Sequence, residues 1–420
     1  MLIELNPAHS AAKVRLAFFI KIFHESLRMI VFFWACLLLV LYTYLGYGLL
    51  LYGLVQIKKP RPVRYHSEAS LPAVTLIIAA YNEADFIAEK IQNSLNLRYP
   101  KGQLSIWIVT DGSDDATPQI AEHIDGVEHF FQPERQGKIA AVNRVMPLVT
   151  TPVVVFTDAN TLLNEDAVVH LVRHFADETV GAVAGEKRVV SPNQDAASGA
   201  GEGFYWRYES ALKRWDAQLY SVVGAAGELF AVRTDLFHEV PADTIIEDFY
   251  LTLSIAKSGY RVAYEPDAYA VEGPSASVGE ELKRKVRIAA GGIQAIVRLR
   301  GLLNPFRHGV LTFQYVSHRV LRWTITPFAL LGLLISNAVL AWEPLIFFRL
   351  FFLGQTLFYT LAIIGWFLAA QRIKAKVFFV PYYFCVMNYA VFAGIIRYLK
   401  GSQSVVWERA ARAPSASART

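Results

Sequence analysis

The sequence contains little cysteine and little charge. Two of its 420 residues are cysteines, and 18% are Asp, Glu, Lys or Arg. Both cysteines, Cys36 and Cys385, lie inside long apolar segments. This excludes a thiol metal cluster and argues against a structural disulfide, because two residues in separate apolar segments cannot supply a set of thiol ligands. The sequence therefore gives no support to cysteine-based redox chemistry.

Charge is also missing from long apolar runs. Residues 29–55 carry no charged side chain, which is longer than the roughly 20 residues needed to cross a bilayer. Three further apolar runs lie near the C-terminus, at about 324–342, 344–370 and 377–397. The predicted segments outside the soluble domain are an amphipathic N-terminal segment (1–28), a membrane helix (29–57), about three membrane helices (324–397) and a basic tail (398–420).

Acidic residues are absent from one long part of the sequence. None lies between Leu282 and Trp342, where nine Lys or Arg residues occur, and the basic segment KKPRPVR (58–64) follows the first apolar run. Positive charge beside membrane spans marks the cytoplasmic face, so we expect the hydrophilic middle of the chain to lie in the cytosol against anionic lipid headgroups. The basic residues flank membrane spans and form no aromatic-lined groove. No nucleic-acid partner is therefore expected.

Between the apolar runs the pattern changes to alternating strands and amphipathic helices. From Leu71 onward, strand-like runs such as VTLIIAA, SIWIVT and PVVVFT alternate with amphipathic helical stretches. This is the signature of a mostly parallel α/β sheet, which we expect over 72–275. Amphipathic helices at the membrane surface should follow over 280–323. The aromatic-rich stretch after Pro192 is expected to form an appended lobe.

Polar side chains follow the first two predicted strands. Tyr81 and Glu83 (in YNE) come after the first strand, and Asp111 (in DGS) comes after the second. Ligands bind at strand ends in open α/β sheets, where a carboxylate can accept a hydrogen bond from a base or a ribose hydroxyl. The alternative for DGS alone is an ordinary turn with residues that cap the next helix.

A second acidic motif, TDAN, ends the later strand PVVVFT. Asp158 and Asn160 are separated by one residue, so their side chains project to the same side of an extended segment. Two such oxygen ligands suit Mg²⁺ or Mn²⁺, which retain waters and bridge phosphate oxygens. A strand that ends in Asp-x-Asn is also a common turn.

A cation follows a glycine before another predicted helix. In the segment ERQGK, Gly137 precedes Lys138 at the helix start, where backbone N–H groups and an ammonium group can together hold a phosphate. A solvated surface loop is the alternative for this segment taken alone.

Two adjacent carboxylates, Glu247 and Asp248, follow an apolar pair and open a predicted helix. Acidic residues in a first turn often only complement the helix dipole. The alternative is that one of them is the general base that takes a proton from an attacking hydroxyl.

The motifs YNE, DGS, GK, TDAN, GAAGELFAVR, IIEDFYLTL and RKVRI occur in this order over about 210 residues between the predicted spans. Over roughly residues 72–300 the chain resembles the membrane-embedded family 2 glycosyltransferases, which include bacterial cellulose, hyaluronan and poly-N-acetylglucosamine synthases. The resemblance implies a GT-A (Rossmann-like) cytosolic domain between transmembrane helices at the bacterial inner (plasma) membrane. It also implies inverting hexosyl transfer from a nucleotide sugar, usually UDP-linked, to a glycan or lipid-linked acceptor in polysaccharide or glycolipid synthesis.

The resemblance also implies partners and residue roles. Other polysaccharide-assembly proteins would be further partners, and Mg²⁺ or Mn²⁺ would be held at Asp158 and Asn160. Asp248 would be the catalytic base, with Glu247 beside it, and Arg287 would neutralise the leaving diphosphate. The residues implied to bind the nucleotide sugar are Tyr81, Glu83, Asp111, Lys138, Asp158 and Arg284.

Two positions depart from the pattern of the synthases. Asn160 replaces the second Asp of their Asp-x-Asp motif, and an amide is a weaker metal ligand than a carboxylate. Ile288 replaces the Trp of their (Gln/Arg)-x-x-Arg-Trp motif, whose ring would stack on an acceptor sugar. Two alternatives therefore stay open. One is a single-addition transferase that acts on a polyprenyl or other lipid, and the other is a catalytically silent nucleotide-sugar-binding membrane subunit.

The predicted spans and the charge bias disagree about the C-terminus. One span before the soluble domain and three after it place both termini outside the cytosol. The tail, however, carries basic residues that favour the cytosolic side, namely Arg397, Lys400, Arg409 and Arg412. Either one span is miscounted or the tail is an exception to the charge rule.

Overall fold

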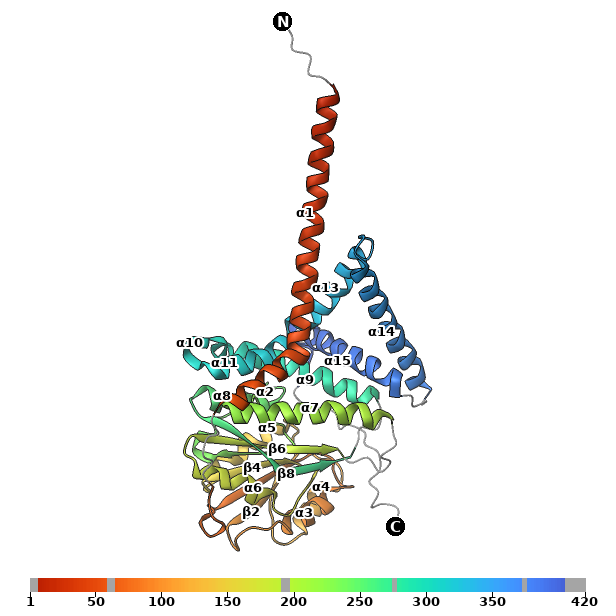
Figure 1. The fold of residues 1–420 in the computed structure, drawn as a ribbon. Helices are drawn as coiled ribbons and strands as arrows, with labels where there is room; N and C mark the ends of the chain where they lie inside the picture. Colours follow the sequence, from red (N-terminus) through yellow and green to blue (C-terminus); the bar gives the residue numbers. More distant parts are fainter. Residues whose placement is uncertain (1–6, 59–64, 190–196, 274–277, 372–375, 405–420) are drawn as a thin grey trace.

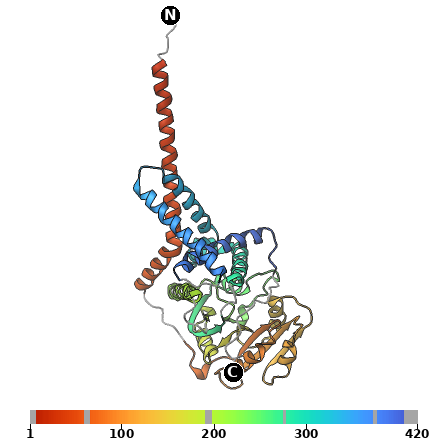
Figure 2. The ribbon, with the colours of Figure 1, turned by 90° about the vertical axis from the view of Figure 1, so that its right-hand side faces the viewer.

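The computed structural model describes the chain except for residues 1–6, 59–64, 190–196, 274–277, 372–375 and 405–420. Most of the basic segment 58–64 and of the predicted tail 398–420 therefore lie outside the described residues. An α/β domain packs against a group of long helices, and α1 (Pro7–Leu41) extends far from that domain (Figures 1 and 2).

The domain is built on one mixed eight-stranded sheet with the order β3-β2-β1-β4-β7-β6-β8-β5. Strands β3, β2, β1 and β4 are parallel to one another, which confirms the predicted α/β class. The strands are β1 (Val74–Ala80), β2 (Leu104–Asp111), β3 (Glu128–Gln132), β4 (Val153–Asp158), β5 (Leu162–Leu163), β6 (Val180–Val189), β7 (Leu229–Arg233) and β8 (Arg261–Glu272).

Helices cover both faces of the sheet. The central strands are almost continuously buried, as expected for strands with helices on both sides. One face packs against α3 (Ile87–Leu95), α4 (Thr117–Glu122) and α6 (Ala167–Val172). The other face packs against α5 (Lys138–Val145), α8 (Glu247–Lys257) and α9 (Val278–Arg298), and it is the face toward the long helices.

The segment after Pro192 does not form an appended lobe, so that prediction is wrong. It contains α7 (Ala197–Leu219) and then β7, which enters the middle of the sheet between β4 and β6. Strand β7 is antiparallel to both neighbours, with Phe156 paired to Phe230 across β4 and β7. This pairing joins residues far apart in the sequence, and the local pattern does not show it.

The predicted apolar runs form helices. They are α1, the π-helical segment η1 (Tyr42–Gly46) and α2 (Tyr47–Ile57) at the N-terminal end, then α13 (Ile325–Leu340), α14 (Ile346–Ala370) and α15 (Lys376–Leu399). The stretch 280–323, predicted to form amphipathic helices, contains most of α9 and then α10 (Pro305–His308), α11 (Val310–Tyr315) and α12 (Leu321–Trp323). By length and composition, three described helices can cross a membrane (His24–Ile57, Ile346–Ala369 and Val377–Leu399). A fourth follows if Val310–Trp323 and Ile325–Leu340, bent by 54°, form one span.

Candidate active site

The loops after β1 and β2 are tied together. The backbone N–H of Asn82 donates a hydrogen bond to Ser113 Oγ (3.1 Å). The Asn82 side chain donates to Asp114 Oδ1 (2.5 Å) and accepts from the Asp114 backbone N–H (3.0 Å). Because β1 and β2 are parallel neighbours, these contacts hold Tyr81 and Asp111 at the same edge of the sheet.

The carboxylate of Asp111 holds the loop that precedes α5. Asp111 is 4% exposed, and its Oδ2 accepts hydrogen bonds from the backbone N–H groups of Gln136 (3.0 Å) and Gly137 (2.6 Å). The guanidinium of Arg135 in the same loop lies 3.6 Å from the centroid of the Tyr81 ring. Asp111 therefore orients the ERQGK loop against the strand ends.

Gly112 is required for this close approach. It has a φ of 65°, and a Cβ at this position would lie 2.5 Å from the backbone N of Arg135. We expect Gly112→Ala to displace the ERQGK loop and to weaken donor-nucleotide binding by at least about tenfold, because overpacking of this kind costs about 1–3 kcal/mol. Isothermal titration with nucleoside diphosphate measures the effect.

Gly102→Ala is the matched control. Gly102 also has a positive φ (77°), but a Cβ there meets nothing within 4 Å. It therefore carries the backbone cost without the collision. Equal nucleotide affinities in the two variants would contradict the role given to the Gly112 contact.

Lys138 lies at the centre of the site and joins three elements. Its Nζ is 2.6 Å from Asp158 Oδ1 at the end of β4 and 2.8 Å from Glu247 Oε1 at the start of α8. Burial lowers the pKa of Lys138, but the two carboxylates outweigh burial and hold that pKa above its usual range. Burial raises the pKa of Glu247, but the ammonium of Lys138 lowers it by more, so the pKa of Glu247 lies below its usual range. Lys138 thus neutralises carboxylates contributed by the sheet and by α8.

Asp248 is in a different electrostatic environment from its neighbour. Burial, and then the adjacent Glu247, raise the pKa of Asp248 to about 7. The hydroxyl of Thr252 donates to the Asp248 carbonyl oxygen (2.7 Å), which holds the first turn of α8. A Cβ at Gly227 would lie 3.4 Å from both Asp248 Oδ2 and Lys138 Nζ, so a glycine here keeps this space open. A carboxylate with a pKa near neutrality is suited to general-base catalysis.

Arg284, the first arginine of RKVRI, lies among several carboxylates. Arg284 lies 3.0 Å from Glu281, 3.8 Å from Glu228 and 3.8 Å from Glu272. Burial lowers the pKa of Arg284, and these carboxylates more than reverse the effect. Glu228 and Glu272 also contact the buried ammonium of Lys187. The sequence motifs did not indicate this network, although Glu228 lies within GAAGELFAVR.

A second buried ionic network lies near the membrane-side helices. Glu209 on α7 is 3% exposed and lies 2.6 Å from Arg319 and 3.2 Å from Arg322. His318 lies 2.7 Å from Asp216, which is about two helical turns after Glu209 on α7. Burial raises the pKa of Glu209, but its cationic neighbours hold it well below the usual range. Pairs such as Glu209 and Arg322, 113 residues apart, leave no local signal in the sequence.

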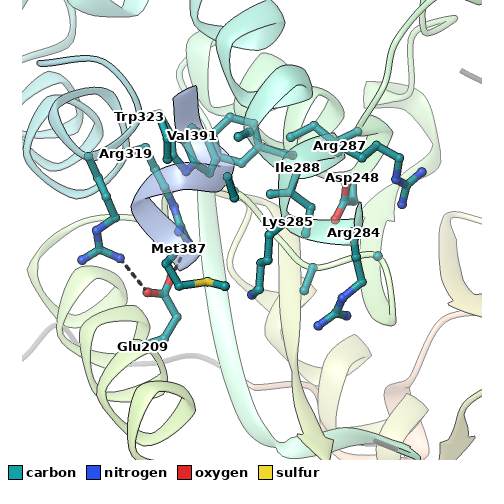
Figure 3. A pocket seen from close by; sticks show the side chains of 18 of the residues that line it. Glu209, Asp248, Arg284, Lys285, Arg287, Ile288, Arg319, Trp323, Met387 and Val391 are labelled. Atoms are coloured by element: carbon teal, nitrogen blue, oxygen red, sulfur yellow. Dashed lines mark hydrogen bonds and ion pairs between the residues drawn. The ribbon is translucent and has the colours of Figure 1, made fainter. Parts of the chain in front are cut away.

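Two adjoining cavities contain every residue that the sequence predicted for the site. Tyr81, Glu83, Asp111 and Asn160 line a small cavity of about 40 Å³. Glu247, Asp248, Arg284 and Arg287 line a larger cavity of about 510 Å³. Lys138 and Asp158 line both cavities and so connect them. Figure 3 shows Asp248, Arg284 and Arg287 at one side of the larger cavity and the Glu209–Arg319 pair at the other.

The larger cavity is also lined by membrane-side helices. Met387 and Val391 of α15, Ile288 of α9 and Trp323 of α12 contribute apolar side chains to its wall (Figure 3). Phe249, next to Asp248, packs edge to face on Trp323 with ring centroids 5.2 Å apart. The side chain of Asp248 and the apolar helices therefore line one cavity.

The metal ligands predicted from TDAN fit an ion only in combination with other ligands. Within the described residues, no group of three or more His, Cys, Asp or Glu side chains is placed to hold a metal. Asp158 and Asn160 line the same small cavity, and Asp158 also contacts Lys138. One carboxylate and one amide suit a Mg²⁺ or Mn²⁺ ion that takes its remaining ligands from a diphosphate and water.

Residues 75–240 match the family model described as Glycosyl transferase family 2. The chain contains a family 2 glycosyltransferase domain. It is 29% identical over 338 residues to a beta-monoglucosyldiacylglycerol synthase of Trichormus variabilis, covering 76% of this chain and 69% of the relative. It is 28% identical over 236 residues to a poly-beta-1,6-N-acetyl-D-glucosamine synthase of Staphylococcus aureus, covering 54% of this chain and 56% of that relative.

A solved structure has the same fold as this glycosyltransferase. It is a mannosyltransferase of Pyrobaculum calidifontis in complex with GDP-Man and Mn²⁺, with a TM-score of 0.67 and 24% identity. The likeness covers 89% of this chain and 100% of that chain. The predicted GT-A fold and the predicted enzyme class, a family 2 hexosyltransferase, are therefore confirmed. The roles of individual residues stay predictions.

Proposed function

We propose that this glycosyltransferase moves a hexose, with inversion, from a UDP-linked sugar to a hydroxyl group of a membrane lipid at the cytosolic face of the membrane. The observation that carries the proposal is the cavity of about 510 Å³, which is lined both by Asp248 and by side chains of the apolar helix α15. A donor sugar and the head of a lipid can meet only in a space that both can reach. The beta-monoglucosyldiacylglycerol synthase of Trichormus variabilis, 69% of whose length is covered, is named for a glycolipid product. This agrees with a lipid acceptor.

In this proposal the base and ribose of the nucleotide lie against the strand ends, next to the residues that line the small cavity. Tyr81, Glu83 and Asp111 line it, and Lys138 and Asp158 stand where it joins the larger cavity. In the proposal the base and ribose lie at one end, the diphosphate lies beside Lys138, and the sugar lies near Asp248; the order of the lining residues supports this arrangement. The ammonium of Lys138 at this junction would balance part of the charge that develops on the leaving diphosphate.

The transfer is a single displacement at the anomeric carbon. The acceptor oxygen forms a bond to that carbon, the bond from the carbon to the diphosphate oxygen breaks, and its electron pair leaves with the nucleoside diphosphate. Asp248 takes the proton of the attacking hydroxyl. Arg287 lines the same cavity and supplies positive charge for the departing group. Attack on the side opposite the leaving group accounts for inversion.

Asp158 and Asn160 would hold Mg²⁺ or Mn²⁺ together with the diphosphate, and the ion would supply charge neutralisation as the leaving group departs. Excess EDTA is then expected to lower donor affinity by at least about tenfold and to stop transfer. Calorimetry of UDP-sugar binding with and without the added ions is the measurement, and product formation is the second readout. Undiminished transfer and unchanged donor affinity in EDTA would remove the metal role from these two residues.

The wall on the membrane side favours a lipid over a glycan chain. Val380, Phe384, Met387 and Val391 of α15 line the cavity at helical spacing, and Ile288 lies where the synthases have an aromatic residue. A growing polysaccharide needs polar partners along its path, whereas a lipid needs an apolar wall that leads to the reacting group. This lining supports a lipid acceptor.

A panel assay tests the proposal. The full chain in lipid nanodiscs is incubated with UDP-glucose, UDP-galactose, UDP-N-acetylglucosamine and GDP-mannose, and released nucleotide is measured while mass spectrometry identifies the product. Diacylglycerol, polyprenyl phosphate and oligosaccharide acceptors form separate arms. A glycosylated lipid with one added hexose is the expected product. A long glycan would replace the lipid proposal, and nucleotide binding without turnover would indicate a silent subunit.

Filling the apolar wall should separate acceptor use from donor use. Met387→Trp places an indole in the cavity beside α15, and we expect lipid glycosylation to fall by about tenfold or more while donor affinity changes little. Tyr389→Trp is the control, because Tyr389 lies on the other face of the same helix and is 60% exposed. Steady-state kinetics with varied lipid acceptor measure both. Equal lipid kinetics in the two variants would contradict the proposed acceptor path.

A further inference from the structure

Helix α15 is long and apolar enough to cross a membrane, yet its end returns to the catalytic domain. Tyr398, in its last turn, packs against the hydrophobic cluster that joins one face of the sheet to α9 and α11. One turn earlier, Gly394 is so close to α9 that a Cβ there would lie 2.6 Å from the Ala289 side chain. The C-terminal end of α15 is therefore on the domain side of the membrane.

The far side of the membrane-side helices is marked by the connection between α13 and α14. Glu343 in this connection accepts a hydrogen bond from Ser26 of α1, and Trp342 beside it is 89% exposed. Phe33 of α1 packs edge to face on Phe348 at the start of α14, with centroids 5.2 Å apart. In Figure 1 this connection is the part of the α13–α14 pair most distant from the sheet.

The domain side is marked by contacts seventeen residues after Ser26, in the segment η1 that continues α1. Thr43 Oγ1 lies 3.0 Å from Thr326 Oγ1 at the start of α13. Seventeen helical residues from Ser26 to Thr43 span about 26 Å, close to the roughly 30 Å of a hydrocarbon core. The N-terminal helix and α13 therefore run side by side across the bilayer, and α14 returns from the tip.

Helix α15 packs on α14, and it contacts the N-terminal helices and α13 near the level of Thr43. Tyr44 donates a hydrogen bond to Asn388 of α15 (2.8 Å), and Phe328, two residues after Thr326, packs on Phe392 (5.0 Å between centroids). Toward its C-terminal end the helix packs along α9, and Tyr398 reaches the hydrophobic cluster shared by the sheet and α9. In Figure 1, α15 lies across the helix group beside α9, whereas α14 runs toward the distant tip.

We propose that α15 does not cross the membrane but lies at the membrane–water interface. There it forms the membrane-side wall of the larger cavity of the site, here called the reaction cavity. The chain then crosses three times, through α1, α13 and α14. By itself α13 has 16 residues, which span about 24 Å, and its two ends lie at the levels of Thr43 and Ser26 of the N-terminal helix. The C-terminal segment of the chain lies on the same side as the catalytic domain, and the N-terminus lies on the opposite side. This count places Arg397 and Lys400 beside the domain, and it removes the conflict between the predicted spans and the charge bias of the tail.

The two faces of α15 fit this position. Met387 and Val391 line the reaction cavity, while Tyr389 and Ile396 are 60% and 52% exposed and meet lipid. A helix at the interface with one face on protein and one on the acyl boundary satisfies both environments. A crossing helix would instead carry its end away from α9 and the domain core.

Cysteine labelling tests the crossing count. A cysteine-free background needs only Cys36→Ala and Cys385→Ser, because these are the two cysteines of the chain. Single cysteines are then placed at Ser402, exposed after α15, at Trp342 on the tip, and at Ser258, exposed on the catalytic domain. Each variant is treated with a membrane-impermeant maleimide in intact cells and again after detergent solubilisation.

The expected result is that Ser402→Cys follows Ser258→Cys and is opposite to Trp342→Cys in intact cells, with all three labelled in detergent. Labelling of Ser402→Cys together with Trp342→Cys would overturn the proposal and restore α15 as a span. A reporter fused after residue 420 of the unsubstituted chain gives the same comparison without any substitution. Because labelling reads position and not transfer, failure of the lipid-acceptor proposal would leave this result unchanged.

Discussion

Asp248→Asn is expected to lower the turnover number by about 10²–10⁴-fold while donor affinity changes by less than about twofold, because an amide cannot take the proton of the attacking hydroxyl. The substitution keeps the size of the side chain, so the first turn of α8 and the neighbouring Lys138–Glu247 contact persist. Single-turnover product formation and calorimetric donor binding, measured on the same preparation, separate chemistry from binding.

The pH profile provides a second readout for Asp248. The pKa of this carboxyl is raised to about 7, and the base acts only when deprotonated. For the wild-type enzyme, kcat/KM should therefore rise with pH up to about 7 and level off above it. The Asn variant should lose this limb, while the control Asp235→Asn, an exposed carboxylate on the domain surface, should retain both rate and profile. Wild-type turnover in Asp248→Asn would show that another group is the base.

Arg287→Gln is expected to lower the turnover number by about 10²–10³-fold, as is typical when one stabilising group is removed from developing negative charge. Arg287 lines the larger cavity with Asp248, and its positive charge is among the influences that lower the pKa of Glu247. In the proposed mechanism this interaction would be strongest when the diphosphate departs. The effect should therefore appear more in kcat than in donor affinity, as measured by steady-state kinetics and calorimetry.

Lys283→Gln on the same helix is the matched control, because its side chain is 64% exposed and pairs with Glu280 at the surface. It should stay within about twofold of the wild type, since exposed ion pairs contribute little. A loss of donor affinity in Arg287→Gln with unchanged kcat would assign Arg287 to donor binding instead of leaving-group stabilisation.

Strand order was predictable only in part. The alternation that begins at Leu71 identifies β1, β2 and β4 and the carboxylates at their ends, because apolar periodicity and side-chain order are local properties. Strand β7 was placed in an appended lobe instead, because its pairing of Phe156 with Phe230 depends on a register between distant segments. The same limit applies to the network of Glu209 with Arg319 and Arg322.

The sequence by itself determined the class of the chain. Runs of apolar residues placed helices at both ends, and the order of acidic and basic motifs between them indicated a family 2 glycosyltransferase, whose domain the comparisons confirmed. Only the tertiary structure decided that Lys138 stands between Asp158 and Glu247, and that α15 returns to the domain beside the reaction cavity. Hydropathy measures what a helix can be buried in, whereas the place it occupies depends on the packing free energy of contacts between residues far apart in the chain.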